Sequence, residues 1–227
     1  MRGNAVGETA ARLDWLWPDA ASLRAMSRPL SLASWHRLRH DPAALLLLAG
    51  SELHAPTSEP TFRYHHFRAA GSVRRAAAAF DKAAPHREDG PDAVDFLDWK
   101  RPPFQNLLRE ATRIARLAEA VAAYTRKCDP GCAWIGGMIA ALGWFAVASR
   151  APAAVEDALG DPDYDSCPLE TESELWGFNH AEVARRVARR MHLPPWLQVI
   201  AGHLDLSTES VRSLGGNAEL TATVRTA

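Results

Sequence analysis

GCAWIGGMIAALGWFAVAS, residues 131–149, carries no charged side chain over nineteen positions. An uncharged helix of that length either crosses a membrane or lies at the centre of a helical bundle. Four glycines and five alanines keep the hydrophobicity of the stretch modest, and no cluster of basic residues flanks it to set an orientation in a membrane. The stretch therefore predicts a buried helix of a soluble protein, with no membrane partner.

Helical spacing of apolar residues continues on both sides of this stretch. A long helix is predicted from Phe104 to about Lys127, and an amphipathic helix capped by Asn179 is predicted from His180 to His192. The polar face of the amphipathic helix carries four arginines: Arg185, Arg186, Arg189 and Arg190. No segment alternates between apolar and polar residues at period two, so the predicted fold class is all-α.

Composition excludes several classes of function. With 47% apolar and 23% charged residues the chain is an ordinary globular protein, and a net charge of −1 argues against a nucleic-acid partner. The N-terminus lacks the apolar core of a signal peptide, and three cysteines form no even framework, which predicts a cytoplasmic location. No cofactor is expected, because the chain has neither a Gly-rich phosphate loop nor a Gly-x-Ser-x-Gly elbow.

The acidic stretch GDPDYDSCP, residues 160–168, contains oxygen-bearing side chains of the kind that bind calcium. Its glycine and the closing glutamate do not stand where a calcium-binding loop needs them. The stretch therefore predicts a solvated turn.

Two pieces of the C-terminal half resemble the HDOD domain, the HD-related output domain of bacterial signalling proteins. The first is AWIGGMIAALGW, residues 133–144, which is similar to the central helix of the family. The second is GFNHAEVARRVARRMHLPPWLQVIAGHLD, residues 177–205. The resemblance implies a compact helical bundle over residues 101–227, cut short at its C-terminal end, with residues 1–100 as an N-terminal helical extension packed on it.

The parent HD superfamily consists of metal-dependent phosphohydrolases, whose site needs an early His, an adjacent His-Asp pair and a late Asp. The resemblance places Asn106 at the early His, and Ala140 and Ala141 at the pair; the late Asp would follow Ala227, the last residue. Alanine cannot bind a metal, and its high helix propensity is expected to keep the helix intact. The resemblance thus implies no metal site, no catalytic residue and no enzymatic activity.

Five further residues match the family pattern and are candidates for a structural or pocket role: Gly143, His180, Glu182, Pro194 and His203. His180 and His203 either line a remnant pocket or serve the ends of their helices. At a helix end, His180 would make local hydrogen bonds and His203 would favour the negative end of its helix. The second interpretation is favoured.

The function that the resemblance implies is that of a non-catalytic regulatory domain in a bacterial signalling pathway. Its partners would be other proteins or an attached output module such as a histidine kinase or cyclase, and two copies could also form a homodimer. Two alternatives stay open. One is a phosphohydrolase whose metal site is rearranged around His180, His203 or the acidic residues 161–165, and the other is a purely structural dimerisation module.

Overall fold

The computed structural model describes residue 22, residues 36–46 and residues 102–227. All regular structure in these ranges is helical, so the predicted all-α fold class is confirmed. From residue 102 on, the helices are α7 (Pro102–Thr125), α8 (Pro130–Ile139), α9 (Leu142–Arg150), α10 (Pro152–Leu159), α11 (Pro168–Trp176), α12 (His180–Arg190), α13 (Pro195–Gly202), α14 (Thr208–Ser213) and α15 (Ala218–Thr226).

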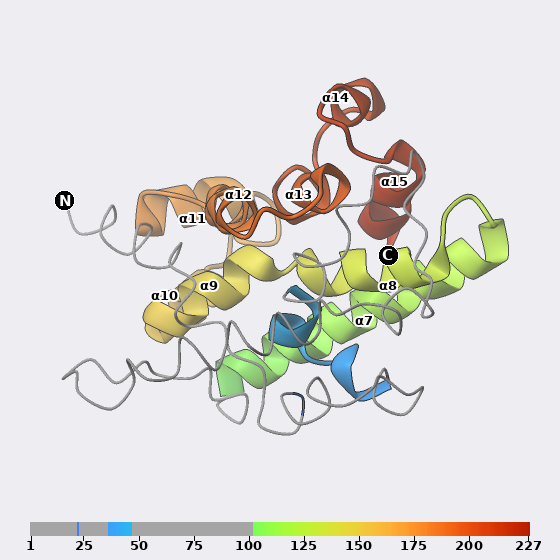
Figure 1. Cartoon of the computed structure of the whole chain (residues 1–227). Coiled ribbons are helices and arrows are strands. Elements are labelled where there is room, and N and C mark those ends of the chain that lie inside the picture. Colours follow the sequence, from blue (N-terminus) through green and yellow to red (C-terminus); the bar gives the residue numbers. More distant parts are fainter. Residues whose placement is uncertain (1–21, 23–35, 47–101) are drawn as a thin grey trace.

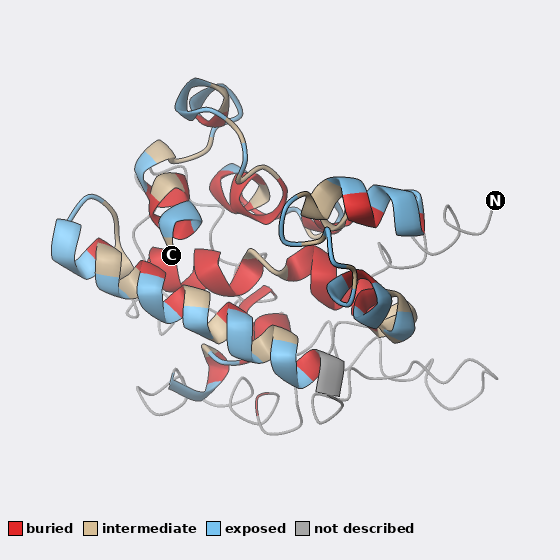
Figure 2. Ribbon diagram, turned by 180° about the vertical axis from the view of Figure 1, so that it is seen from behind, coloured by how far each residue is buried: buried red, intermediate tan, exposed pale blue. Residues whose placement is uncertain are grey.

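The helices form layers around α8 and α9, which lie in the middle (Figure 1). Helix α7 packs along one side of this pair, while α12 and α13 cover the other side (Figure 1). Small residues bring α7 and α8 close together: a β-carbon on Gly137 would lie 2.5 Å from the α-carbon of Ala115. Helix α7 turns its exposed residues outward, whereas α8 and α9 are buried along nearly their whole length (Figure 2).

The uncharged stretch lies in the core. Residues 130–150 are long and apolar enough to cross a membrane. An 18-residue stretch within them has a mean hydropathy of 1.7, but 83% of that stretch is buried inside the protein. Most of the large apolar side chains of this stretch, such as Ile135, Leu142 and Phe145, are at most 1% exposed. Their neighbours are α7 on one side and α12 and α13 on the other, which is the environment of a core helix.

The prediction that this stretch forms one intact helix is wrong. Helix α8 ends at Ile139 and α9 begins at Leu142, with Ala140 and Ala141 in the turn between them. Helix propensity is a weak preference that tertiary packing overrides. Here α8 packs mainly on α7 while α9 packs on α12, so the chain changes direction at the two alanines.

Two helices and one loop differ from the sequence-based expectation. Helices α11 and α14 were not predicted, and residues 160–167 are not a fully solvated turn, because Tyr164 is half-buried and packs against the core. Arg185 also departs from the solvated face expected of it: its side chain donates a hydrogen bond to the carbonyl oxygen of Gly202 at 2.9 Å.

Most of the predicted N-terminal extension lies outside the described residues. Within residues 36–46, Arg39 forms an ion pair with Glu119 of α7 at 2.7 Å, and its guanidinium lies 3.5 Å from the ring centroid of Trp134. The Trp134 indole N–H donates to the Arg39 carbonyl oxygen at 2.8 Å. This segment therefore contacts α7 and α8, while the domain boundary near residue 100 stays a prediction.

Candidate functional site

The positions that the resemblance places at the metal ligands of the HD superfamily carry alanine or asparagine. Ala140 and Ala141 are half-buried at the break between α8 and α9, and their methyl groups pack against the core. Asn106 is exposed on α7, where its side-chain oxygen accepts a hydrogen bond from Arg109 at 3.2 Å. Divalent metals need carboxylate or imidazole ligands that converge on one point, so this set does not fit them.

Gly143 is the second residue of α9, directly after this break, and lets α9 approach α12. A β-carbon at position 143 would overlap the carbonyl oxygen of His180, the first residue of α12. Only glycine fits such a close approach between a helix and another backbone. Gly143 therefore fixes where the N-terminus of α12 lies relative to the middle layer.

A buried carboxylate holds the same N-terminus from the other side. The Glu172 side chain in α11 is fully buried and accepts a hydrogen bond from the backbone N–H of His180 at 2.7 Å. Its two oxygens also lie 2.8 Å and 2.7 Å from Nδ1 of the His180 ring. A negative charge is favourable at a helix N-terminus, where backbone N–H groups lack partners within the helix.

The chain reaches this arrangement through two local signals. Helix α11 ends at Gly177, whose φ of 76° lies in the left-handed region that favours glycine. Asn179 then caps α12 by accepting a hydrogen bond from the backbone N–H of Glu182 at 3.0 Å. The turn between these signals brings Glu172 and His180 together across eight positions of sequence.

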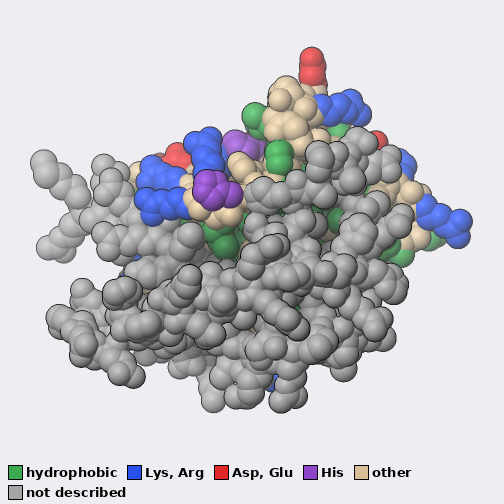
Figure 3. Space-filling view, viewed as in Figure 1, with side chains coloured by type: hydrophobic (Ala, Val, Ile, Leu, Met, Phe, Trp, Pro, Cys, Tyr) green, Lys and Arg blue, Asp and Glu red, His purple; other side chains and the backbone are tan. Residues whose placement is uncertain are grey.

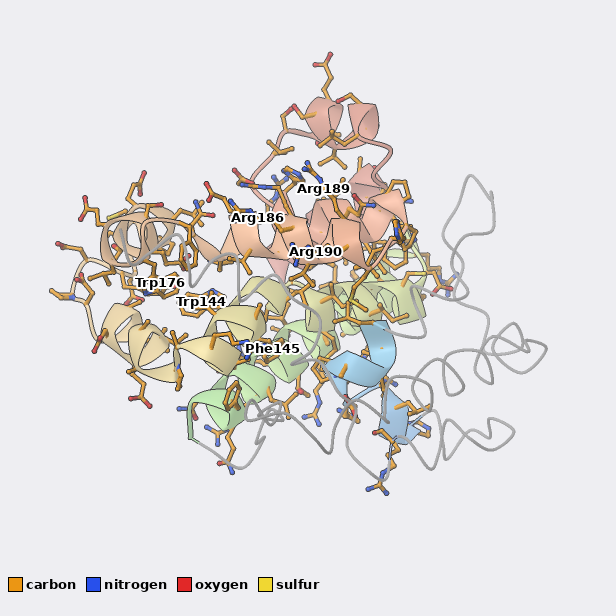
Figure 4. The ribbon with its side chains drawn as sticks, turned by 60° about the vertical axis from the view of Figure 1, so that its left-hand side comes forward. Trp144, Phe145, Trp176, Arg186, Arg189 and Arg190 are labelled. Atoms are coloured by element: carbon orange, nitrogen blue, oxygen red, sulfur yellow. The ribbon has the colours of Figure 1, made fainter. Side chains whose placement is uncertain are left out.

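Aromatic side chains surround the Glu172–His180 pair. The Tyr164 hydroxyl donates to Glu172 at 3.1 Å, and burial, with Glu172 as the next cause, raises the pKa of Tyr164. The Trp144 ring lies 5.4 Å from His180, 5.6 Å from Tyr164 and 5.3 Å from Trp176, measured between centroids. Figure 4 shows Trp144 and Trp176 side by side at this end of the bundle.

This cluster is better suited to holding helices than to catalysis. A carboxylate on Nδ1 fixes the orientation of a histidine, as in many catalytic sites. Here, however, the His180 ring contacts the Trp144 ring and Glu172, and no nucleophile is bonded to it in the described part of the chain. The cluster joins α9, α11, α12 and the loop of Tyr164 in one contact network.

His203 lies apart from His180. It is the residue at which α13 ends, and its charged neighbours are Arg185, Asp205 and Arg189. Burial is the largest cause that lowers the pKa of His203, followed by the charge of Arg185. No contact joins the two histidines among the residues that the structure describes.

The remaining two candidates have local roles in the backbone. Glu182 stands in the first turn of α12, where an acidic side chain favours the helix N-terminus. Pro194 is buried and precedes α13, and its carbonyl oxygen accepts hydrogen bonds from Leu197 and Gln198. Neither residue contacts the Glu172–His180 pair.

No rearranged metal centre is visible in the described ranges. Groups of three His, Cys, Asp or Glu side chains placed to hold a metal ion are absent from residues 36–46 and 102–227. An open groove of about 720 Å³ runs along α7 and is lined by polar and apolar side chains such as Arg109, Thr112 and Leu117. None of the eight candidate residues lines that groove.

Sequence reasoning missed Glu172 and Tyr164. Both lie in the segment interpreted as an acidic turn and its continuation, where carboxylates are usually solvated. One signal was present: PLETESELWG, residues 168–177, has proline at the first position and glycine after the last, which is typical of a short helix. The charge pattern itself gave no indication that Glu172, unlike the nearby carboxylates Glu170 and Glu174, would be buried.

Comparison with known proteins gives one match. The family model described as HDOD domain matches residues 98–205. The searches of curated proteins and of solved structures each found no match. The match covers the layers α7 to α13 and the Glu172–His180 pair, so residues 98–205 of this chain form an HDOD domain.

Proposed function

We propose that this domain is a non-catalytic regulatory module of a bacterial signalling protein, which acts in the cytoplasm through contacts with other proteins. The observation that carries the proposal is the pair Ala140 and Ala141, which the family resemblance places where a phosphohydrolase of the HD superfamily needs His-Asp. The fold around these positions is intact, with Phe145 and Ile139 at most 1% exposed. A domain that is selected for its shape and its contacts would keep its core but would not need to keep metal ligands.

The Glu172–His180 pair supports this role. It replaces no metal ligand and makes its hydrogen bonds within the protein, so its contribution is to set how α11 and α12 sit on α9. A partner regulates such a module only if it binds two states with different affinities. The junction of α9, α11 and α12 is where we expect such states to differ. Helix α11, helix α12 and the loop of Tyr164 meet at the Glu172 carboxylate, and Trp144 of α9 packs on the His180 ring.

The absence of catalysis is tested with the purified chain. Hydrolysis of bis(p-nitrophenyl) phosphate and of a cyclic dinucleotide is measured with manganese, iron or nickel present, beside a phosphohydrolase that has all its ligands. We expect rates equal to those of buffer with metal alone. Turnover that depends on His180 or His203 would contradict the proposal.

The regulatory role is tested in the protein as the cell makes it. The activity of the module that is joined to or bound by this domain is compared between the wild type, Glu172→Gln and the matched surface variant Glu174→Gln. We expect Glu172→Gln to change that activity while Glu174→Gln leaves it unchanged, at equal protein levels. Equal activity of all three would argue for a purely structural module.

A further inference from the structure

The described helices separate their charges into two neighbouring surfaces. The first is the arginine face, defined as Arg186, Arg189 and Arg190 in the C-terminal half of α12, all of which are exposed. Figure 3 shows Lys, Arg and His side chains gathered over this part of the molecule. Figure 4 places the three arginines away from Trp144 and Trp176.

Two of these arginines have no partner of their own. Neither Arg186 nor Arg189 forms an ion pair or a hydrogen bond in the part of the chain that the structure describes. Arg185 differs from them, because its guanidinium is engaged by the carbonyl oxygen of Gly202. Within the arginine face, Arg186 and Arg189 therefore present positive charge that no described carboxylate neutralises.

The second surface, the acidic lobe, is formed by α10, α11 and the loop between them. The chain has no Lys or Arg from residue 151 to residue 184. The exposed carboxylates of the lobe are Glu156, Asp157, Asp163, Asp165, Glu170 and Glu174. None of them pairs with a cation within the described residues.

We propose that the arginine face binds the acidic lobe of a second copy of this chain. Each surface is the charge complement of the other, and both lie on one protomer, on consecutive elements of the chain. In a two-fold dimer a contact between one residue and another occurs twice, so a single axis near the α11–α12 junction brings both arginine faces onto both lobes. The pairing goes beyond the proposed regulatory role and does not depend on it.

Other acidic partners fit these observations less well. A nucleic acid or an anionic membrane attracts the arginine face but repels the adjacent lobe, and the net charge of −1 gives no long-range attraction. A second copy is the partner that satisfies both surfaces at once. Pairs of exposed charges are weak and are screened by salt, so the dimer is expected to be weak and to dissociate as ionic strength rises.

Sedimentation velocity on the full chain tests the proposal. At about 20 mM salt, where screening is weak, we expect the wild type to form dimers that dissociate at about 500 mM. Arg186→Glu/Arg189→Glu and Glu170→Lys/Glu174→Lys should each weaken dimerisation by about tenfold or more, since the pairs that the substituted residues form become like-charge pairs. The control Arg116→Glu/Arg212→Glu makes the same charge change on exposed positions of α7 and α14, and should dimerise as the wild type does.

Mixing the two interface variants gives the decisive result. One then carries acidic and the other basic side chains on both surfaces, so their equimolar mixture restores opposite charges at each contact. We expect heterodimers at low salt from two proteins that are monomeric alone, with unchanged helical circular dichroism. A wild type that is monomeric at low salt, or a mixture that stays monomeric, would overturn the proposal.

Discussion

At the scale of single residues, Glu172 is the side chain on which the candidate site depends. It is fully buried and accepts hydrogen bonds from the backbone and from Tyr164, besides contacting the His180 ring. A buried carboxylate is tolerated only when such partners compensate for the water it has lost. We therefore expect substitutions of Glu172 to lower the free energy of unfolding, which can be measured without an activity assay.

Glu172→Gln tests that role. The amide places an N–H group where one oxygen now faces a donor, so we expect a loss of about 1–3 kcal/mol in the free energy of unfolding. Urea denaturation measures this loss. The exposed Glu174 of the same helix is the control, since Glu174→Gln should change stability by less than about 0.5 kcal/mol. Equal losses of stability in the two variants would show that the buried Glu172 carboxylate does not contribute more than an exposed one.

Gly143 provides a steric test of the contact between α9 and α12. Because a β-carbon there overlaps the His180 carbonyl oxygen, Gly143→Ala should force the two helices apart and destabilise the protein by about 1–3 kcal/mol or more. Gly160→Ala, at the exposed end of α10, should stay within about 1 kcal/mol of the wild type. A fully stable Gly143→Ala protein would mean that the helices do not approach this closely.

His203 makes a testable contribution to the pH dependence of stability. Its pKa is lowered in the folded state, mainly by burial, so the unfolded chain binds more protons near its ordinary pKa of 6.5. This stabilising contribution is present above pH 6.5 and is lost as the pH falls from that value toward the lowered folded pKa. We expect His203→Gln to show a shallower loss of stability than the wild type between about pH 7.5 and pH 5.

Urea denaturation at several pH values measures both slopes. His40→Gln serves as a comparison, because His40 also has a lowered pKa, chiefly from burial, and lies in the separate segment 36–46. In His40→Gln, the contribution of His203 to the change of stability with pH should persist. An unchanged slope in His203→Gln would contradict the assignment.

At the scale of helices, the break between α8 and α9 leaves room at the two positions that the resemblance assigns to a metal-binding pair. Ala140 and Ala141 are half-buried, so larger side chains can be placed there at moderate cost. We expect Ala140→His/Ala141→Asp to remain folded, within about 2 kcal/mol of the wild type. It should still bind no stoichiometric manganese, because two ligands without a converging third do not hold the ion. Equilibrium dialysis followed by metal analysis gives the answer, and one ion per chain would contradict it.

The helices themselves were predictable where a local pattern defines them. Helix α12 has an Asn179 cap and apolar residues at helical spacing, and the structure buries Val183 and Val187 as that spacing requires. The break at Ala140 was not predictable, because alanine favours a helix and only packing against two different layers interrupts it. Helix α11 has few apolar residues, and its Pro168 and Gly177 are weaker signals than periodicity.

At the scale of the whole molecule, the position of the uncharged stretch was predictable and the candidate site was not. A run of nineteen uncharged, largely apolar positions favours burial, and the structure places most of them in the middle layer. The Glu172–His180 contact depends instead on how three helices meet. No local sequence pattern distinguishes the buried Glu172 from the other carboxylates of the acidic stretch. The family resemblance supplied His180 but not its partner.

The proposed regulatory module keeps an HD-related core and is expected to bind no metal ion. Isothermal titration of the purified chain with manganese tests this expectation most directly, with metal content determined before and after extensive dialysis. We predict no binding above the background of weak surface carboxylates, and the same result for His180→Ala. A stoichiometric, saturable site that disappears in His180→Ala would mean that the domain has kept a metal centre.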